Sequence, residues 1–259
     1  DLDQLMLLDK ENRSLINSKE IKENEKKILS KNKDASNFEK SKKLSSDIEK
    51  ISLKQNQLQT KINDIISQMP NIALDDVPVG KDETSNKLIK KHGKIPEFKF
   101  KIKSHIEIGS KNDQIDFTSS SKLSGSRFVV LNSNYALLER GLINFMLDVH
   151  VNKFSYKEIS PPLLVNENVM FGTGQLPKFE DDQFEIKLNS KEDRKFLIPT
   201  AEVVLTNLVR DSFVNPKDLP MRFVSSTPCF RKEAGSYGKD TKGMIRQHQF
   251  YKVELVSVV

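Results

Sequence analysis

The hydrophobic pattern of the first 69 residues predicts a pair of helices. Residues 2–69 contain no Gly and no Pro, and their positive and negative charges are nearly balanced. In the second half of this stretch, apolar residues recur at alternating steps of four and three: Leu44, Ile48, Ile51, Leu58, Ile62 and Ile65. This heptad spacing, in which Gln55 takes the one vacant position, is typical of a coiled-coil seam.

A second, less regular seam precedes it. Asn12, Lys19 and Lys22 interrupt its four leucines, which are Leu5, Leu8, Leu15 and Leu29. Residues 30–36 (SKNKDAS) are expected to reverse the chain, so that two helices of about 30 residues form an antiparallel hairpin roughly 45 Å long. A hairpin with one thin seam favours a projecting arm that contacts something large. The alternative is that its charges are only a solvated face.

After Met69 the helical pattern stops, and the chain divides into three parts. Residues 1–69 form the helical arm, residues 70–103 a linker that carries Pro, Gly and charge without periodicity, and residues 104–259 a second domain. In this domain, residues 135–151 have apolar side chains at helical spacing. Short strands are expected at residues 157–165, 195–200 and 221–227, and twice within residues 227–254. Helices that feed a mostly antiparallel sheet predict an α+β fold.

The two strands expected within residues 227–254 carry charges where an ordinary hairpin would carry core residues. Side chains two positions apart on a strand share a face, so the second strand gathers five on one face: Arg246, His248, Phe250, Lys252 and Glu254. In the same way, the first strand gathers Cys229, Arg231 and Glu233.

A dry core cannot explain this face, because burial of an unpaired charge costs several kcal/mol per ion. The pattern predicts a floor that binds a planar, phosphate-bearing ligand. Phe250 would stack on a base, the arginines would bind phosphate and the carboxylates would bind an amine. The alternative is an exposed ladder of salt bridges with Phe250 turned edgewise.

Other polar stretches give weaker signals. Residues 234–243 hold three Gly and two Lys, which suits contact with a mobile polyanion. Residues 171–184 contain two glycines but lack the GK[ST] ending of a phosphate loop, so that interpretation is rejected. Thr200 and Glu202 would suit a small ammonium group if the chain is extended, or a capping pair at a helix start. The four histidines are too scattered to indicate a metal site: His92, His105, His150 and His248.

Composition limits the partners. The net charge of +6 favours acidic or phosphate-bearing partners, but it is not the pattern of a dedicated DNA-binding protein. One cysteine, Cys229, excludes an intramolecular disulfide and a Cys-cluster zinc site, which fits a reducing cytosol. No apolar run approaches the roughly 18 residues of a membrane span, so no membrane partner is expected.

Four motifs, in order and behind a helical hairpin, resemble the bacterial seryl-tRNA synthetases across essentially the whole chain: GTGQLPKF, IPTAEV, TPCFRKEAGSYGKDTKG and IRQHQFYKVE. The resemblance implies a class II aminoacyl-tRNA synthetase fold and a cytoplasmic homodimer. It implies activation of L-serine with ATP and Mg²⁺ to seryl-adenylate, then transfer of serine to tRNA(Ser), with tRNA(Sec) as a further acceptor to consider.

The resemblance also implies roles for single residues. A serine-binding TAE element matches Thr200, Ala201 and Glu202, and Glu254 is expected to contact the same serine. The FRxE element that holds ATP matches Arg231, Lys232 and Glu233, with Arg231 on the α-phosphate as the catalytic residue and Phe250 stacked on adenine.

Larger segments receive roles on the same basis. The resemblance places residues 234–243 at the tRNA acceptor end and the arm on the long variable arm of the tRNA. It places the helix from Tyr135, together with residues 159–165, in a dimer-forming motif.

Some features of the family have no counterpart in the chain. The third class motif, a glycine-rich segment that ends in an arginine, is absent, so the catalytic domain is expected to be incomplete. Metal ligands are unknown and are expected beyond Val259, and the first helical turns are expected before Asp1. A non-catalytic relative, or one that charges a carrier protein, is the alternative function. A purely structural coiled coil would explain residues 2–69 alone.

Overall fold

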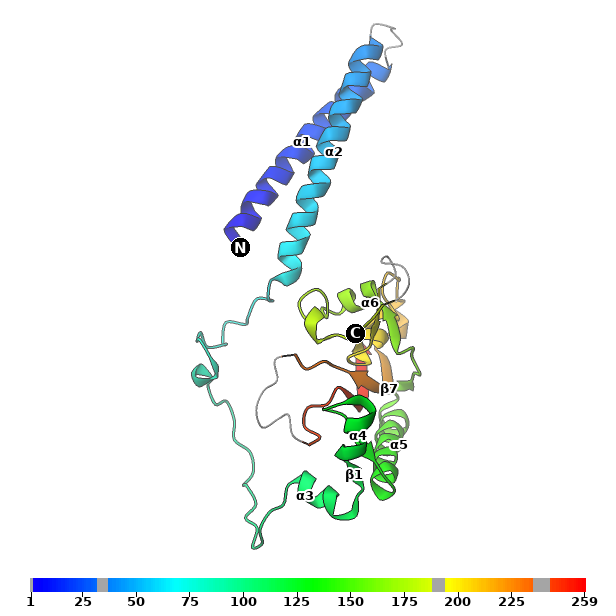
Figure 1. Ribbon diagram of the computed structural model, residues 1–259. Helices are drawn as coiled ribbons and strands as arrows, with labels where there is room; N and C mark the ends of the chain where they lie inside the picture. The colour runs from blue at the N-terminus through cyan, green and yellow to red at the C-terminus, as the bar shows by residue number, and fades with distance from the viewer. Residues whose placement is uncertain (1, 32–36, 188–193, 235–242) are drawn as a thin grey trace. The chain divides into compact units, whose positions relative to one another are not determined.

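The computed structural model describes residues 2–31, 37–187, 194–234 and 243–259. The chain forms two compact units, Asp1–Lys87 and Leu88–Val259 (Figure 1). Among the helices that the structure describes, none has the length and apolar composition needed to cross a membrane.

The first unit contains the predicted helical hairpin, made of α1 (Leu2–Lys31) and α2 (Asn37–Gln68). The helices run antiparallel, because Asn12 near the start of α1 contacts Gln59 near the end of α2. The heptad positions Leu44, Leu58 and Ile62 are buried in the seam, which confirms the coiled-coil prediction. Of the expected reversal at residues 30–36, the first two residues end α1 and the other five lie outside the described part of the chain.

One polar layer interrupts this seam. Asn12 is 7% exposed, and its side-chain nitrogen donates to Oε1 of Gln59 at 3.3 Å. The other polar atom of Asn12, Oδ1, is buried without a hydrogen-bond partner among the described residues. A buried polar group of this kind lowers stability but favours one register of the two helices.

Residues 69–104 contain one short 3₁₀ helix, η1 (Glu83–Ser85), and are otherwise without regular structure. The side chain of Asp82 caps η1, because its Oδ1 accepts a hydrogen bond from the backbone of Thr84 at 3.0 Å. Every residue of this stretch is exposed to solvent.

The second unit is an α+β fold, as predicted. Its helices are α3 (His105–Gly109), η2 (Ser110–Asn112), α4 (Phe117–Ser124), α5 (Asn134–Phe154), α6 (Glu167–Gly172), η3 (Glu180–Asp182), α7 (Glu202–Asn207) and η4 (Pro216–Asp218). Among the described residues the strands form three sheets, in the orders β1-β2, β3-β7-β8 and β4-β6-β5. Their bounds are β1 (Ile115–Asp116), β2 (Val130–Leu131), β3 (Lys157–Glu158), β4 (Leu164–Asn166), β5 (Glu185–Ile186), β6 (Lys195–Leu197), β7 (Met221–Phe230) and β8 (Gln249–Val258).

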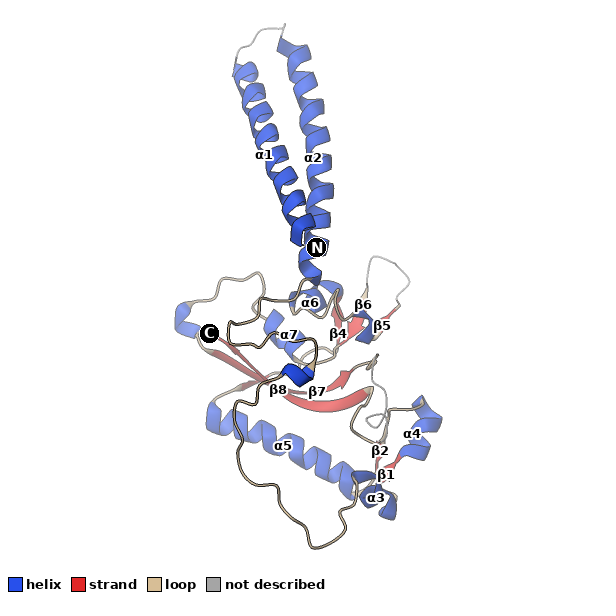
Figure 2. Cartoon of the chain, turned by 90° about the vertical axis from the view of Figure 1, so that its left-hand side faces the viewer, coloured by secondary structure: helices blue, strands red, loops and turns tan. Residues whose placement is uncertain are grey.

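The central element of this unit is the pair of ten-residue strands β7 and β8. They run antiparallel, from Met221 opposite Val258 to Phe230 opposite Gln249, and β3 pairs parallel with β7. α7 lies over one face of the pair and α5 along the other (Figure 2).

The face toward α7 is apolar at one end and polar at the other. At the apolar end, two elements meet: Ala201, directly before α7, and Leu205 of α7 pack against side chains of the strands. These strand residues are Met221, Phe223, Val256 and Val258. Farther along the strands, three cross-strand pairs share this face: Ser225 with Glu254, Thr227 with Lys252, and Cys229 with Phe250. The helix therefore covers the apolar half of the face, and the polar half is left for another purpose.

The structure corrects two strand predictions. The strand expected at residues 157–165 is divided between β3 and β4, which belong to different sheets. Pro161 and Pro162 lie between them, and proline cannot donate the hydrogen bonds of a continuous ladder. Conversely, the strands expected at 221–227 and from Thr227 onward are one strand, β7.

A third correction concerns the charged residues. Arg231 and Glu233 lie beyond the end of β7, and Arg246 and His248 lie before the start of β8. Glu233 leaves the extended conformation, with φ of 53°. The strand periodicity therefore holds for Phe250, Lys252 and Glu254, but it does not extend to these four side chains.

Arg194 ties three short segments of the second unit together. Its guanidinium contacts carboxylates of α6, η3 and β5, which belong to Glu167, Glu180 and Glu185. The hydrogen bond from Arg194 lowers the pKa of the Glu185 carboxyl below its usual value. The carboxylates in turn raise the pKa of Arg194 above that of a free arginine.

We expect Asn12→Leu to stabilise the arm by about 1 kcal/mol, because it removes a buried oxygen that has no partner. Gln59 is exposed and keeps Asn63 as a second partner, at 3.0 Å. Hydrogen exchange of α1 and α2 amides in the whole chain would measure the change. Asn17→Leu is the matched control, since Asn17 is on the exposed side of α1. Equal protection in the two variants would contradict this account of the seam.

We expect Arg194→Gln to lower the free energy of unfolding at pH 7 by about 1 kcal/mol, because three carboxylates lose their shared cation. Since the pKa of Glu185 is lowered in the folded protein, this contribution is present above its unfolded pKa and lost as the pH falls through the folded one. The difference from the unsubstituted protein should therefore shrink below about pH 4. Urea unfolding at pH 7 and at about pH 3 would measure it.

Arg140→Gln is the control for this experiment. Arg140 is exposed on α5, and no ion pair joins it to another described residue. A loss of stability in Arg194→Gln that is the same at both pH values, or no larger than in the control, would refute the proposed role of Arg194 in holding the three segments together.

Candidate functional site

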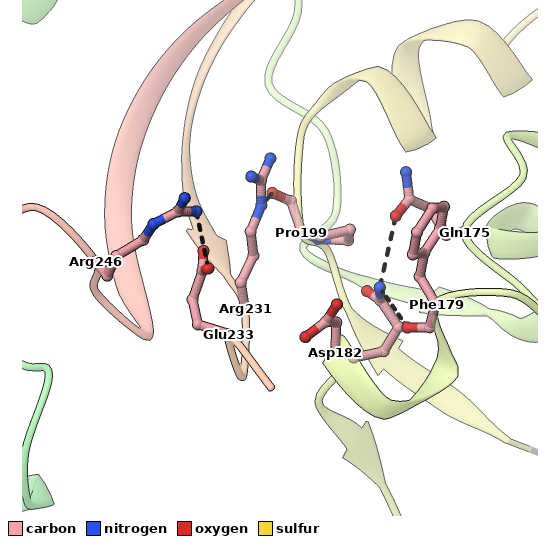
Figure 3. A pocket seen from close by; sticks show the side chains of 8 residues that line it. Gln175, Phe179, Asp182, Pro199, Arg231, Glu233 and Arg246 are labelled. Carbon is pink, nitrogen blue, oxygen red and sulfur yellow. Dashed lines mark hydrogen bonds and ion pairs between the residues drawn. The ribbon is translucent and has the colours of Figure 1, made fainter. Parts of the chain in front are cut away.

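A cavity of about 350 Å³ lies beside the polar half of the β7–β8 face, a size suited to a small ligand. Figure 3 shows the side chains that line it: Gln175, Phe179, Asp182, Gln183, Pro199, Arg231, Glu233 and Arg246. Two predicted site residues, Arg231 and Glu233, are thus part of its wall.

Arg231 is held at the end of β7 by contacts on both sides. Its backbone nitrogen donates to the carbonyl of His248 at 3.0 Å, and Nδ1 of His248 lies 2.9 Å from the Arg231 carbonyl. Its Nε donates to the carbonyl of Pro199 at 3.2 Å, and its guanidinium carbon lies 5.4 Å from the ring centre of Phe250. No described residue accepts a hydrogen bond from its two terminal nitrogens, a geometry suited to an anion.

Glu233 adopts a left-handed backbone conformation that is uncommon for a residue with a side chain. Two arginines hold it there. Nη1 of Arg246 donates to its carboxylate at 3.1 Å, and Nη1 of Arg127 donates to its carbonyl at 2.9 Å. The side chain is only 13% exposed, so its charge is largely withdrawn from water and balanced by Arg246.

Asp182 holds the residues on either side of Glu233. Its backbone carbonyl accepts from the nitrogen of Lys232 at 2.9 Å, and its carboxylate accepts from the nitrogen of Ala234 at 2.7 Å. The side chain of Lys232 itself is exposed. Asp182 belongs to η3, and Arg194 binds Glu180 of the same turn. The contacts of Arg194 therefore support the cavity wall indirectly.

A second cluster joins Thr200 to β8. The Thr200 hydroxyl donates to the carboxylate of Glu254 at 2.5 Å and accepts from the ammonium of Lys252 at 2.7 Å. Lys252 also forms an ion pair with Glu254. Thr200 is 3% exposed, and the Glu254 side chain is 21% exposed. A carboxylate and a hydroxyl that already hold one ammonium group are chemically able to hold another.

The two clusters are adjacent along the chain. Pro199, which accepts from Arg231, directly precedes Thr200, and Phe250, Lys252 and Glu254 follow one another along the same face of β8. A half-buried Phe250 thus lies between the guanidinium of Arg231 and the Thr200 cluster.

Ala201 and Glu202 do not join this cluster. Ala201 is fully buried and packs with Leu205 and Phe223. Glu202 begins α7 and is exposed, so the extended geometry that would align it with Thr200 is not formed. The capping alternative is not formed either, because α7 has no side-chain cap.

Sequence reasoning gave no role to several residues that shape the site. For Lys252 the sequence contains a usable signal, because Lys252 and Glu254 alternate along the strand on the face that is expected to be polar. Arg127 and Asp182 lie far from residues 231–234 in sequence, and neither follows a motif that would indicate the contact.

The described residues do not fit a protein-bound Mg²⁺ ion. They contain no group of three or more His, Cys, Asp or Glu side chains arranged to hold a metal. The carboxylates of Glu233 and Glu254 are each paired with a cation, and the three glutamates around Arg194 share its guanidinium.

Comparison with known proteins shows which proteins the chain resembles. Residues 183–259 match the model of the tRNA synthetase class II core domain (G, H, P, S and T). A serine–tRNA ligase of Pelagibacter ubique is 59% identical over 259 residues, which are 100% of this chain and 62% of that protein. A serine–tRNA ligase of Wolbachia pipientis is 52% identical over 218 residues, which are 84% of this chain and 50% of that protein.

Solved structures agree. A seryl-tRNA synthetase of Pyrococcus horikoshii, complexed with ATP, superposes with a TM-score of 0.82 at 30% identity, over 98% of this chain and 62% of that one. A cytoplasmic serine–tRNA ligase of Naegleria fowleri, in complex with AMP, gives 0.79 at 25% identity, over 98% of this chain and 58% of that one. The chain thus spans about half to three-fifths of the relatives that it matches. Identity of this level extends through both the helical arm and the class II core, and the chain is similar to the seryl-tRNA synthetases over its whole length.

Proposed function

We propose that the chain forms the tRNA-binding arm and part of the active site of an ATP-dependent serine–tRNA ligase. This enzyme activates L-serine as seryl-adenylate and transfers the serine to tRNA(Ser). The observation that carries the proposal is the cavity at Arg231 beside the Thr200–Lys252–Glu254 cluster. One part suits a phosphate-bearing ligand and the other an amino acid, and Pro199, which lines the cavity, directly precedes Thr200.

The first step joins the two substrates directly. A carboxylate oxygen of serine attacks the α-phosphorus of ATP, a phosphorus–oxygen bond forms, and pyrophosphate leaves with the electrons of the bond that breaks. No protein nucleophile is needed. Rate enhancement comes from alignment of the two ligands and from cationic groups fixed where negative charge accumulates. Transfer then moves the seryl group from the adenylate to a hydroxyl at the tRNA acceptor end, with AMP as the leaving group.

Arg231 is the residue that we assign to the α-phosphate. Its Nε is bound to Pro199 and its plane is near Phe250, so the terminal nitrogens are directed before a ligand arrives. Phe250 offers a ring for adenine to stack on. Glu233 completes the ATP wall, where its carboxylate orients Arg246 at 3.1 Å. Lys232 is exposed and can approach the phosphates from the solvent side.

Thr200 and Glu254 are the residues that we assign to serine. The serine ammonium would share the Glu254 carboxylate with Lys252, or replace Lys252 there. Ala201 acts by packing, because its burial against Leu205 and Phe223 fixes the position of Thr200. Glu202, exposed at the start of α7, is an expected serine contact on the resemblance alone.

The wider features of the proposal rest on the same family. A homodimer is supported by α5, which exposes a series of large apolar side chains: Leu137, Leu138, Leu142, Phe145 and Met146. Mg²⁺ would enter with the ATP phosphates and, when bound, would offset their charge. The arm would bind tRNA(Ser), with tRNA(Sec) as a further acceptor, and a role in translation places the enzyme in the cytoplasm.

Amino-acid-dependent exchange of pyrophosphate into ATP tests the proposed function. We expect exchange with serine alone among the twenty amino acids, measured on the protein made from the complete reading frame that encodes this chain. No exchange with any amino acid, from a protein shown to be folded, would favour the non-catalytic relative instead.

In that protein we expect Arg231→Ala to slow serine-dependent exchange by about 100-fold or more, as loss of a fixed charge contact in a transition state does. The exchange rate of Arg231→Lys should lie between those of Arg231→Ala and the unsubstituted protein, because lysine keeps the charge and loses the bidentate geometry. Arg222→Ala is the control, since Arg222 is exposed on β7, on the face opposite to that of Phe223 and Cys229. Exchange at the unsubstituted rate in Arg231→Ala would remove this residue from the α-phosphate.

A further inference from the structure

The positive charge of the chain is concentrated in one segment. Residues 88–103, here called the basic segment, contain six lysines and one acidic residue, Glu97, which gives them a net charge of +5 out of +6 for the whole chain. The lysines are Lys90, Lys91, Lys94, Lys99, Lys101 and Lys103. The other 243 residues are therefore almost neutral as a set, with 36 basic and 35 acidic side chains.

The basic segment also exposes large apolar side chains. Their exposed fractions run from 52% at Phe98 to 90% at Ile95, and the set is Leu88, Ile89, Ile95, Phe98, Phe100 and Ile102. From Phe98 to Lys103 apolar and basic residues alternate strictly. In an extended chain, this alternation places the lysines on one side and the apolar residues on the other. The rings of Phe98 and Phe100 accordingly lie together, with centres 5.4 Å apart.

A linker that serves only as a tether does not need these residues. Flexible linkers are poor in large apolar and aromatic side chains, because such residues favour burial. Clustered lysines interleaved with aromatic rings are instead the combination that binds nucleic acid, in which phosphates meet the cations and bases stack on the rings. An acidic protein surface would account for the lysines but not for the paired rings.

The end of the basic segment is fixed to the body of the second unit. Ser104 and Glu107 cap α3 reciprocally, with hydrogen bonds of 3.2 and 2.8 Å between side chain and backbone. The next residue, His105, accepts at Nε2 from the backbone nitrogen of Met244 at 2.9 Å. Lys101 and Lys103 thus shortly precede His105 in the sequence, and His105 contacts Met244, which shortly precedes β8. Figure 1 shows the segment as an open trace that leads into α3.

We propose that the basic segment is an RNA-binding surface for the tRNA substrate. The lysines contact the sugar-phosphate backbone, and Phe98 and Phe100 pack on unpaired bases or ribose faces. This contact is distinct from those of the helical arm. The inference rests on the proposed function, since it takes tRNA as the substrate.

The test compares three proteins made from the complete reading frame, with a tRNA(Ser) transcript as the probe. The first carries Lys99→Gln, Lys101→Gln and Lys103→Gln, the second carries Lys122→Gln, Lys157→Gln and Lys217→Gln, and the third is unsubstituted. The second set removes the same charge from exposed positions elsewhere in the unit. We expect the first variant to bind tRNA at least 10-fold more weakly in low salt. Its plot of log affinity against log salt should be less steep by about 2 to 3, because three phosphate contacts are lost.

Two further readouts make the result specific. Serine-dependent pyrophosphate exchange should be unchanged in the first variant, because adenylate formation needs no tRNA. The double variant Phe98→Leu and Phe100→Leu should weaken tRNA binding without a change in salt dependence, because leucine keeps apolar area but removes the stacking ring.

Three outcomes would overturn the proposal. Affinity and salt dependence of the first variant equal to those of the control would show that the lysines do not meet phosphate. A changed oligomeric state of the ring variant by light scattering, with tRNA affinity intact, would show a protein–protein surface instead. An unsubstituted protein that shows exchange but binds no tRNA would refute the tRNA part of the proposed function, and this inference with it.

Discussion

The β7–β8 pair, covered by α7 on only half of one face, is the constraint on which the rest of the site depends. Where α7 packs, the face is apolar, and the burial of Ala201 and Leu205 against Phe223 stabilises the sheet. Beyond the N-terminal end of α7, the same face carries Phe250, Lys252 and Glu254. Because Thr200 directly precedes Ala201, the packing that stabilises the fold also places a hydroxyl beside the Glu254 carboxylate.

The other wall of the site depends on contacts between distant segments. The residues after β7 leave the sheet, and a left-handed Glu233 would be unfavourable without support. Arg127, Asp182 and Arg246 supply that support from three different parts of the second unit. A geometry fixed before a ligand binds is what electrostatic stabilisation of a transition state requires, because the charges need not reorganise during the reaction.

The sequence predicted those features that depend on local periodicity. The heptad spacing gave the hairpin, helical spacing gave α5, and the period of two placed Phe250, Lys252 and Glu254 on one face. It failed where distant contacts decide the conformation. The chain leaves the strand after Phe230, where Asp182, some fifty positions earlier, binds the backbone nitrogens of Lys232 and Ala234, and no periodicity contains that information. The three carboxylates around Arg194 likewise come from three separate elements.

The pairing of Lys252 with Glu254 has a consequence for how an amino acid would bind. Without a ligand, this corner of the site is already electrically neutral, because one ammonium group occupies the carboxylate. In the function that we propose, the ammonium group of the amino acid would share the carboxylate with Lys252 or replace Lys252 there, and replacement would be an ion exchange. In the absence of a ligand, this pairing avoids the high free-energy cost of an unpaired buried carboxylate. Under that proposal, the affinity for the amino acid would depend on the small difference between two similar cations, which would favour fast release.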